Sequence, residues 1–591
     1  MAIIVVTEKP SVGRDIARVL HVTEKCDGYL RGNGYAVTWA VGHLVGLAQP
    51  HEIDPRWKSW KQNHLPIIPK NWPLVVFSKT SKQYEIIKKL LCSPKTEKII
   101  CATDAGREGE LIFRYIYEKI NCKIPVQRLW ISSLTSEAIK NGFNNLRDSA
   151  YFDDLASAAK GRSRADWLVG MNFSRSYTLK NNDFYSVGRV QTPTLAMIVE
   201  RTQEINKFIP ENYLEVIAAF KASTGTYKGT YFEGKNNTHL PEDGKKAEEI
   251  VSRAYSGKAT IESIKKELKR NRPPLLYDLT ELQRHANKIY GFSANKTLRI
   301  AQNLYEKYKL ISYPRTDSRY ITSDVAKTLN SIVDTIKEQY KEYLAPETGK
   351  KNISPRFVSD LKVTDHHAII PTTTKNTILV QGSDESRIYD LICRRLLAAF
   401  HEDYITSVTT VITGIDSDPL QNTDDPVKDL YRSTGTMVVQ KGWKILDPPP
   451  TRKKPSTPQL KDQVFPDGLK KGQRPDVEDA QAVKKQTKPP NPYTEATLLT
   501  AMETAGRLID DKEISNIMRD NGLGTPATRA AIIETLLERE YIFRKGKTLH
   551  ASAKGINLID IVHEHVKSPA MTGQWEYRLR NIERKKDSLD K

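Results

Sequence analysis

The sequence contains little cysteine, and none of it is arranged in metal-binding pairs. Five cysteines are scattered along 591 residues, and no two of them form a CxxC pattern. A zinc ribbon requires such pairs, and a disulfide framework usually appears in a short, cysteine-dense chain. The cysteine content therefore argues against both, and it favours a reducing, cytoplasmic setting.

Long apolar runs are also missing. No run approaches the roughly 20 apolar residues that cross a bilayer, so we expect no membrane partner. The apolar residues 3–6 are too few for a signal sequence and lack a basic leader, so they are expected to form a buried first strand. The phosphate-binding pattern GxxxxGK[ST] is absent as well, which is consistent with a reaction that uses no ATP.

Positive charge is in clear excess. Lysine and arginine outnumber aspartate and glutamate by 20, in a chain with 39% apolar and 27% charged residues. This is the composition of a globular protein that binds a polyanion, and nucleic acid is the expected partner. The alternative is that the lysines only maintain solubility. At roughly 150 residues a domain, the length predicts about four domains.

The hydrophobic pattern changes several times along the chain. Residues 1–150 alternate short apolar strands with amphipathic helices, which favours a parallel sheet flanked by helices. Further on, helical and strand-like blocks alternate, and residues 447–492 resemble a Pro- and Lys-rich linker. The helical blocks are 155–205, 278–345 and 495–579, and the strand-like blocks are 213–264 and 404–446.

The segment ISYPRTDS at residues 311–318 combines a phenol and a guanidinium on either side of a proline. Pro314 disfavours a helix and biases Tyr313 toward extended geometry. Tyr313 could then attack phosphorus while Arg315 binds the non-bridging oxygens. A surface turn is the alternative, because such tripeptides are common.

Acidic and basic residues follow two predicted strands of the first domain. Glu8 and Lys9 come after the first strand, and Asp104 and Glu108 come after the strand at 98–102. Ligands bind at the carboxyl edge of α/β sheets, and Mg²⁺ is held by few protein oxygens. Glu8 is a candidate acid or base and Lys9 a candidate proton donor. Alternatively, Asp104 and Glu108 only stabilise a helix N-terminus.

Together these motifs resemble the type IA DNA topoisomerases and, among them, bacterial topoisomerase III. TEKPS and DAGREGE resemble the Toprim domain, and ISYPRTDS resembles the segment that carries the catalytic tyrosine. Other segments agree in order and spacing, so the resemblance runs through nearly the whole chain. The segments are TEKPS (7–11), DAGREGE (104–110), RLWISSLT (128–135), SVGRVQTPTL (186–195), ISYPRTDS (311–318), DHHAIIPT (365–372) and GLGTPATRA (522–530).

The resemblance implies a multidomain toroid of mixed α/β class. A Toprim α/β domain would span 1–154, and a domain carrying the catalytic tyrosine would span 276–402. A helical DNA-binding domain would combine 155–212 with 480–591, and a β-rich arch would combine 213–275 with 403–479. Such an enzyme cuts one DNA strand through a 5′-phosphotyrosine, passes another strand and reseals the break. It relaxes negative supercoils, decatenates DNA, or both.

The resemblance also implies roles for single residues. Tyr313 would be the nucleophile, and Arg315 would stabilise the transition state. Lys9, with Glu8, would protonate the departing 3′ oxygen. His366 corresponds to a histidine near the scissile phosphate, although structural histidines are common. Gln302 and Glu306 would lie on a helix beside the nucleophile and would orient other groups.

The acidic motif departs from the family pattern. The pattern DxDxE has three carboxylates, but this chain has Asp104, Gly106 and Glu108. We expect a single Mg²⁺ held by Asp104 and Glu108, with Glu8 or water in place of the missing ligand. Glu110 is a second candidate for that role.

The resemblance and the residue types suggest DNA contacts at Arg107, Arg189, Gln191, Thr528 and Arg529. Arginine can bind phosphate with two hydrogen bonds, and threonine can donate a hydroxyl; surface ion pairs are the alternative. Three aromatic residues could stack on bases, although a buried core position is the more common fate of each: Trp130, Trp167 and Tyr177.

Single-stranded DNA is the expected substrate. The enzyme is expected to be a monomer located at the bacterial nucleoid or on a plasmid, with a helicase as a candidate partner. Two other classes stay open. A Toprim primase or nuclease would share Glu8, Asp104 and Glu108 but would not need Tyr313 and Arg315. A nucleic-acid-binding protein that has lost activity is the other alternative, suggested by Gly106.

Overall fold

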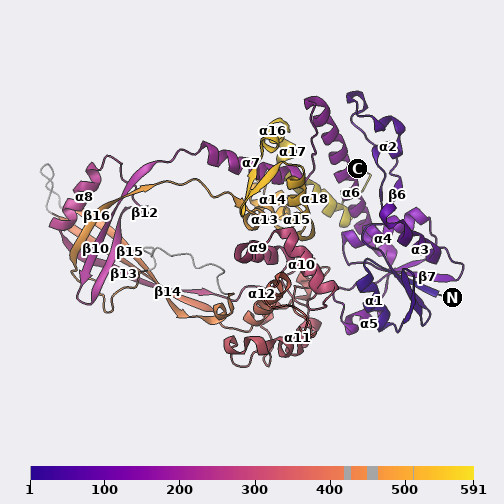
Figure 1. The fold of residues 1–591 in the computed structure, drawn as a ribbon, viewed down its shortest axis with the longest axis horizontal. Coiled ribbons are helices and arrows are strands. Elements are labelled where there is room, and N and C mark those ends of the chain that lie inside the picture. Colours follow the sequence, from indigo (N-terminus) through magenta and orange to yellow (C-terminus); the bar gives the residue numbers. More distant parts are fainter. Residues whose placement is uncertain (1, 418–426, 449–462, 510, 591) are drawn as a thin grey trace.

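The chain forms a ring-shaped outline (Figure 1). The computed structural model describes residues 2–417, 427–448, 463–509 and 511–590. A β-rich arch lies at one end of the ring, and an N-terminal α/β domain lies at the other, with both chain ends beside it. This architecture confirms the expected fold class. Within the described ranges, none of the helices combines the length and apolar content that crossing a bilayer requires.

The N-terminal domain contains a seven-stranded mixed sheet in the order β2-β3-β4-β1-β7-β8-β9. Its central strands are continuous apolar runs, and β1 pairs in parallel with both β4 and β7, as expected for a sheet that is covered on both faces. The elements are β1 (Ala2–Thr7), α1 (Pro10–Val19), β2 (Glu24–Cys26), β3 (Tyr29–Gly32), β4 (Tyr35–Trp39), β5 (Val45–Leu47), α2 (Pro50–Ile53), β6 (Leu74–Val76), α3 (Ser81–Leu91), β7 (Thr96–Ala102), α4 (Arg107–Ile120), β8 (Val126–Arg128), α5 (Ser136–Asn144) and β9 (Arg147–Asp148).

The arch is an antiparallel sheet in the order β13-β14-β15-β11-β10-β16, with α8 packed on it. Its strands come from two distant stretches of chain. They are β10 (Asn212–Ala222), β11 (Gly225–Glu233), β12 (Asn236–Asn237), β13 (Lys258–Asn271), β14 (Tyr404–Ser417), β15 (Val427–Gln440) and β16 (Asp476–Gln486), with α8 at Lys245–Ser256.

Strand β16 corrects two expectations. Residues 476–486 belong to a strand rather than a linker, and residues 480–486 lie in the arch sheet rather than in the helical domain. The reason is pairing with β10, which runs from Asn212 opposite Gln486 to Lys221 opposite Asp476. Because this strand is polar on the exposed face, its sequence resembles a solvated linker. The remainder of the expected linker falls partly on 449–462, outside the described residues.

The segment at 276–402, here called the tyrosine domain, is mainly helical. Its helices lie between the arch and the N-terminal domain (Figure 1), and its largest core is built from their apolar faces. The helices are α9 (Leu279–Tyr290), α10 (Ala294–Glu306), α11 (Ser323–Ile336) and α12 (Asp384–Ala398).

The helical domain combines α6 and α7 with the C-terminal helices around a shared core. A small sheet, β17-β19-β18, interrupts the tail that was expected to be wholly helical. Gly546, with a φ of +61°, makes the tight turn between β18 and β19. The elements are α6 (Asp153–Asn181), α7 (Gln191–Lys207), β17 (Tyr493–Thr494), α13 (Glu495–Glu503), α14 (Lys512–Asn521), α15 (Pro526–Glu538), β18 (Ile542–Lys545), β19 (Thr548–Ala551), α16 (Ala553–Ile561), α17 (Glu564–Lys567) and α18 (Pro569–Glu583).

Arg128 at the end of β8 holds the loop that follows β7. Its fully buried guanidinium donates to the carbonyls of Thr103 (2.8 Å) and Asp104 (2.7 Å) and pairs with the buried carboxylate of Glu110 (3.0 Å). Gly109 allows the same loop to approach α4, because a Cβ there would lie 2.2 Å from the Asp104 carbonyl oxygen. The backbone around Asp104 is therefore fixed from both sides.

Replacing Arg128 with methionine should destabilise the N-terminal domain. The change leaves the buried Glu110 charge with Arg114 as its remaining ion-pair partner and removes donors from the loop carbonyls. Breaking a buried pair in this way costs about 3–5 kcal/mol. Thermal unfolding of the R128M protein should show a clearly lower Tm. Arg147, its exposed neighbour on β9, provides the control, since R147A should melt like the wild type. Equal Tm values for R128M and wild type would contradict this role.

Candidate active site

The loops that follow β1 and β7 lie at the same edge of the sheet, as the sequence predicts. Strands β1 and β7 pair in parallel with Thr7 opposite Ala102, so both end at the same level. Glu8 and Lys9 leave the first strand, and Asp104 follows the second. This confirms the sequence argument that the carboxyl ends of parallel strands gather functional residues.

Lys9 is the centre of this cluster. Its Nζ lies 2.6 Å from Asp104 Oδ2 and 3.0 Å from Glu8 Oε1. Burial alone would lower the pKa of Lys9, but the carboxylates of Asp104 and Glu8 raise it well above its usual value. Burial and the nearby Asp104 charge raise the pKa of Glu8. Lys9 is therefore a protonated ammonium held between two carboxyl groups.

The segment that carries Tyr313 is attached to the segment at 366–371. Ser312 donates its backbone N–H to the Ile370 carbonyl at 2.9 Å and its hydroxyl to the Ala368 carbonyl at 3.1 Å. The hydroxyl of Thr316 donates to the His366 carbonyl at 2.7 Å. Tyr313 and His366, 53 positions apart, are thereby placed on one rigid unit.

The side chain of Tyr313 meets the N-terminal domain across the domain boundary. Lys9 Nζ lies 4.1 Å from the centre of its ring, and the His366 ring lies 4.3 Å away. His366 Nε2 lies 3.3 Å from Asp104 Oδ2. Burial alone would raise the pKa of Asp104, but His366 and Lys9 hold it far below its usual value.

Burial raises the pKa of Tyr313 to about 12, and the Asp104 charge adds to this effect. The Lys9 ammonium acts in the opposite direction and favours the phenolate. The phenol is therefore neutral near pH 7, and Lys9 is the group that makes its ionisation easier.

Arg315 is exposed and oriented by Gln302 on α10. With its oxygen turned toward the guanidinium, the Gln302 amide accepts from Arg315 Nε at 3.1 Å and from Nη2 at 2.7 Å. Gln302 thus has the orienting position expected of it. Glu306 is the exposed last residue of α10 and lies at the helix end that leads to Tyr313.

The three expected metal ligands do not converge. In the described part of the chain, no group of three or more His, Cys, Asp or Glu side chains is placed to share one ion. Glu108 is exposed and bonds His43, which lowers the pKa of Glu108, whereas Glu8 is buried and Asp104 is partly buried. Glu110 cannot replace a ligand, because its buried carboxylate pairs with Arg114 and Arg128.

Asp365 is a site residue that the sequence argument missed. Its carboxylate lies beside Gly106, so that a Cβ added to that glycine would be 2.5 Å from Oδ2. Burial is the main cause that raises the pKa of Asp365 to about 7, and the charges of Asp317 and Asp104 add to it. The only signal in the sequence was its place before His366 in the motif at 365–372.

Two expected DNA-binding arginines are instead held in a domain interface. Glu576 on α18 accepts from Arg107 Nη1 (2.8 Å) and lies 3.4 Å from Arg189 Nη1; Arg162 is its third partner, at 3.3 Å. Burial alone would raise the pKa of Glu576, but these arginines lower it to about 2. Arg189 is 6% exposed, so in this structure Arg107 and Arg189 join α18 to the rest of the ring.

Arg529 is also buried, at 3% exposure, and donates to the Leu523 carbonyl and to Thr280 on α9. Thr528 forms a capping box with Thr525 at the start of α15. Gln191 begins α7, and its side-chain nitrogen is buried without a hydrogen-bond partner in the described structure. Trp167 is buried, as expected for most large aromatic residues, and its indole N–H donates to the Ala48 carbonyl.

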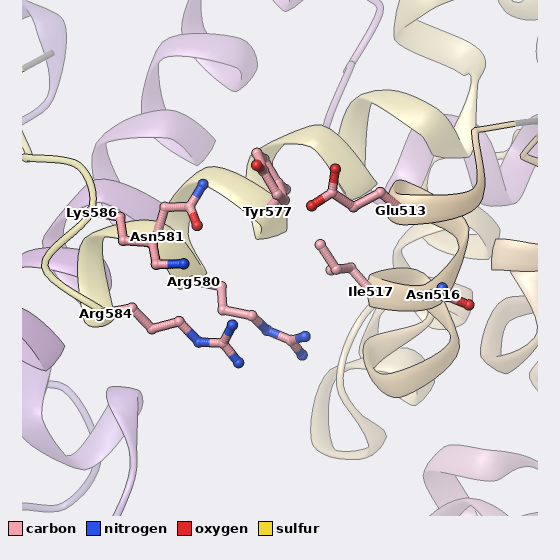
Figure 2. A pocket seen from close by; sticks show the side chains of 8 residues that line it. All are labelled: Glu513, Asn516, Ile517, Tyr577, Arg580, Asn581, Arg584 and Lys586. Carbon is pink, nitrogen blue, oxygen red and sulfur yellow. The ribbon is translucent and has the colours of Figure 1, made fainter.

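A basic pocket of about 430 Å³ lies between α14 and α18. Figure 2 shows Arg580 on α18 and Arg584 just after that helix on one side, and Glu513 on α14 on the other. Within the described residues, no carboxylate lies within ion-pair distance of Arg584 or Lys586. The sequence argument did not find this pocket, because its arginines are spread along a helix that also carries Glu576 and Glu583.

Comparison with known proteins identifies the family. A family model described as DNA topoisomerase matches residues 150–591, and a Toprim domain model matches residues 3–134. The chain is 40% identical to DNA topoisomerase 3 of Shouchella clausii over 98% of its own length and 77% of that protein. It is also 40% identical to DNA topoisomerase 3 of Bacillus subtilis, over 98% of this chain and 78% of that one.

A solved structure gives the same fold. Full-length topoisomerase I from Thermotoga maritima has a TM-score of 0.68 to this chain at 22% identity, covering 99% of this chain and 87% of that one. The Toprim domain is a metal-binding fold that typically uses Mg²⁺. The chain therefore belongs to the type IA DNA topoisomerases, enzymes that cut one DNA strand, pass another through the break and reseal it.

Proposed function

We propose that Tyr313 is the nucleophile and that the residues packed around it carry out the proton transfers. The observation that supports this most is the contact of one phenol ring with both Lys9 and His366 across the domain boundary. These two side chains come from different domains, and both lie next to Asp104. A purely structural tyrosine would not require this gathering of charged groups.

In the proposed reaction the Tyr313 oxygen attacks a phosphodiester phosphorus. The new bond is a 5′-phosphotyrosyl ester, and the bond from phosphorus to the 3′ oxygen breaks. Lys9 gives a proton to the departing 3′ oxygen, and Glu8, which has a buried oxygen without a hydrogen-bond partner, accepts the phenolic proton. Resealing runs the same transfers in reverse. The ester conserves the energy of the broken bond, so no ATP is consumed.

Arg315 and His366 would stabilise the charge that develops on the phosphate. Arg315 is exposed and presents a guanidinium that Gln302 holds in one orientation, which suits a bidentate contact with two phosphate oxygens. The His366 ring lies 4.3 Å from the Tyr313 ring, so it would act on the same phosphate. Preorganised donors of this kind lower the barrier for phosphoryl transfer.

The buried carboxylates fit Mg²⁺. Glu8 and Asp104 offer hard oxygen donors, and Glu8 Oε2 makes no hydrogen bond in the described structure. We propose that these two residues hold the ion and that Glu108 contributes only after it leaves His43. When bound, Mg²⁺ would neutralise part of the phosphate charge.

Replacing Tyr313 with phenylalanine should abolish ATP-independent relaxation of negatively supercoiled plasmid in the presence of Mg²⁺. The change removes one oxygen atom, so the fold should be retained. Tyr320→Phe is the matched control: its hydroxyl contacts Lys362, remote from Lys9, and relaxation should continue. Relaxation by the Tyr313→Phe enzyme would exclude Tyr313 as the nucleophile.

Replacing Lys9 with glutamine should shift the pH dependence of cleavage to more alkaline pH. Lys9 lowers the pKa of Tyr313, so its loss raises a value that is already about 12 and makes the phenolate rarer at any given pH. The rate of single-turnover cleavage of a single-stranded oligonucleotide should be measured over the alkaline range. The rise of this rate with pH should occur at a higher pH in the variant than in the wild type. An unchanged pH profile would indicate that Lys9 does not act on the phenol.

We propose that the basic pocket between α14 and α18 binds the backbone of single-stranded DNA. Replacing both Arg584 and Lys586 with alanine should weaken oligonucleotide binding. The slope of log K against log salt should fall by about 1.4, at about 0.7 for each lost phosphate contact. Arg189→Ala should instead lower the Tm, because Arg189 pairs with Glu576 in a buried interface. An unchanged salt slope in the double variant would contradict this assignment.

The proposed working form is a monomer that acts on single-stranded segments at the nucleoid or on a plasmid. The basic pocket and the excess positive charge support a polyanionic substrate. Relaxation and decatenation both follow from the same cleavage step, and a helicase that exposes single strands would supply the substrate. Titrating such a helicase into a decatenation assay would test the last point, with no stimulation as the opposing result.

A further inference from the structure

The segment at residues 49–73 leaves the N-terminal sheet and docks along α6; Figure 1 shows α2, which belongs to this segment, beside that helix. Two sets of hydrogen bonds fix its backbone. The side chain of Asn172 bonds the backbone N–H and the carbonyl of Ile67, at 2.5 and 2.9 Å, and Arg175 Nη1 donates to the Trp57 carbonyl at 2.8 Å. The segment is therefore held in place by backbone contacts.

Two arginine–tryptophan contacts lie on the same side of α6, 11 residues or about three turns apart, but they differ in exposure. The guanidinium of Arg164 lies 5.3 Å from the ring centre of Trp72, which packs edge-on against the buried Trp167. The guanidinium of Arg175 lies 5.1 Å from the ring centre of Trp60, which is 37% exposed. The first contact belongs to the docked interior, whereas the second is open to solvent.

The open contact is part of a wider aromatic surface. Phe184, in the connection between α6 and α7, is 45% exposed, and its ring centre lies 6.2 Å from that of Trp60, with 30° between the ring planes. The guanidinium of Arg539, at the end of α15, lies 5.1 Å from the Phe184 ring. We call Trp60 and Phe184 the aromatic ledge. Single exposed aromatic residues need no explanation, but two neighbouring rings with a guanidinium over each form the pattern on which bases stack.

The two cations of the ledge have no acidic partner. Arg175 is 5% exposed, its Nε has no hydrogen-bond partner in the described structure, and burial lowers its pKa with no carboxylate to oppose the effect. Throughout the part of the chain that the structure describes, no carboxylate lies within ion-pair distance of Arg175 or Arg539. The nearby carboxylate of Asp183 instead accepts the backbone N–H of Phe184 at 2.7 Å. Buried charges are normally paired, so this surface favours an anionic ligand.

We propose that the aromatic ledge stacks an unpaired base of single-stranded DNA, while Arg175 and Arg539 attract the phosphates beside that base. Stacking tolerates any sequence, because every base has a π-face. This inference rests on the function proposed above, and it adds a DNA contact outside the boundary that holds Tyr313.

The ledge and the basic pocket are connected through α6. Helix α18, which lines the pocket, packs against α6, and Arg162 of α6 pairs with Glu576 of α18. Arg175 comes 13 residues after Arg162, or about 20 Å along the helix. A single strand whose backbone lies in the pocket could therefore follow α6 toward the ledge.

The first test measures binding of a fluorescent oligothymidylate to the full chain by anisotropy. Trp60→Ala should weaken binding by about fivefold or more, and Trp60→Phe, which keeps a ring, should retain most of the affinity. Tyr151→Ala is the matched control, since Tyr151 is 72% exposed and carries Arg147 at 5.8 Å on a different surface. It should bind as the wild type does. If Trp60→Ala lowers the Tm, Phe184→Ala makes the decision, because it removes the other ring and leaves the docked segment intact. Wild-type affinity in both alanine variants would overturn the proposal, and the ledge would then serve another partner.

The second test separates stacking from electrostatic attraction. A stacked base releases no counterion, so the slope of log K against log salt should be the same in Trp60→Ala and in the wild type. The double variant of Arg584 and Lys586 should instead lower that slope. An oligonucleotide of the same length that lacks bases should bind equally well to Trp60→Ala and to the wild type. An equal loss of affinity for both oligonucleotides would overturn the stacking role.

These outcomes are independent of the nucleophile. Binding needs no cleavage, so adding Trp60→Ala to Tyr313→Phe should weaken oligonucleotide binding by the same factor as in the wild type. If Tyr313→Phe relaxed DNA, the proposed nucleophile would fail while the binding results stood. If Trp60→Ala and Phe184→Ala bound DNA normally, the ledge would fail while Tyr313 remained the nucleophile.

Discussion

The partly buried ion pair between Lys9 and Asp104 is the interaction on which the site depends. At 2.6 Å it places an ammonium where two carboxylates, a phenol ring and an imidazole meet. A buried charge is tolerated only when it is paired, so the chain devotes much of its local structure to holding this pair. Because β1 and β7 end at the same level, the loops that carry Lys9 and Asp104 lie side by side. Arg128 and Gly109 then fix the backbone of Asp104.

Several polar contacts cross the boundary between the Toprim and tyrosine domains. Besides the groups around Lys9, Thr135 donates to Asp324 at 3.1 Å, and the cavity beside Asp365 is only about 20 Å³. In the proposed mechanism, strand passage requires this boundary to open and close. Polar contacts can be exchanged for water at modest cost, whereas a large apolar interface would resist separation. The rigid joints lie elsewhere, in the apolar cores of each domain and in the arginine cluster around Glu576.

Much of the site could be predicted because the necessary information is local. Pro314 sets the geometry of Tyr313 and Arg315, and the apolar strands at 2–7 and 96–102 end just before Glu8 and Asp104. Other features could not be predicted, because they depend on contacts between segments that are far apart in the sequence. Residues 480–486 look like a linker yet pair with β10, and Arg189 looks like a phosphate ligand yet lies buried against Glu576, 387 positions away.

The sequence by itself determined the residue types and the order of the parts: a tyrosine beside an arginine, acidic loops at strand ends, and motifs spaced as in the type IA topoisomerases. These features follow from local backbone geometry and from spacing along the chain, and both can be read from the sequence without knowing the fold. Only the tertiary structure decided which side chains meet. It brought Asp365 into the space left by Gly106, turned Glu108 toward His43 and buried two of the predicted DNA-binding arginines, Arg189 and Arg529. Electrostatic pairing and close packing act between atoms that lie near each other in space, and that proximity exists only after the domains dock.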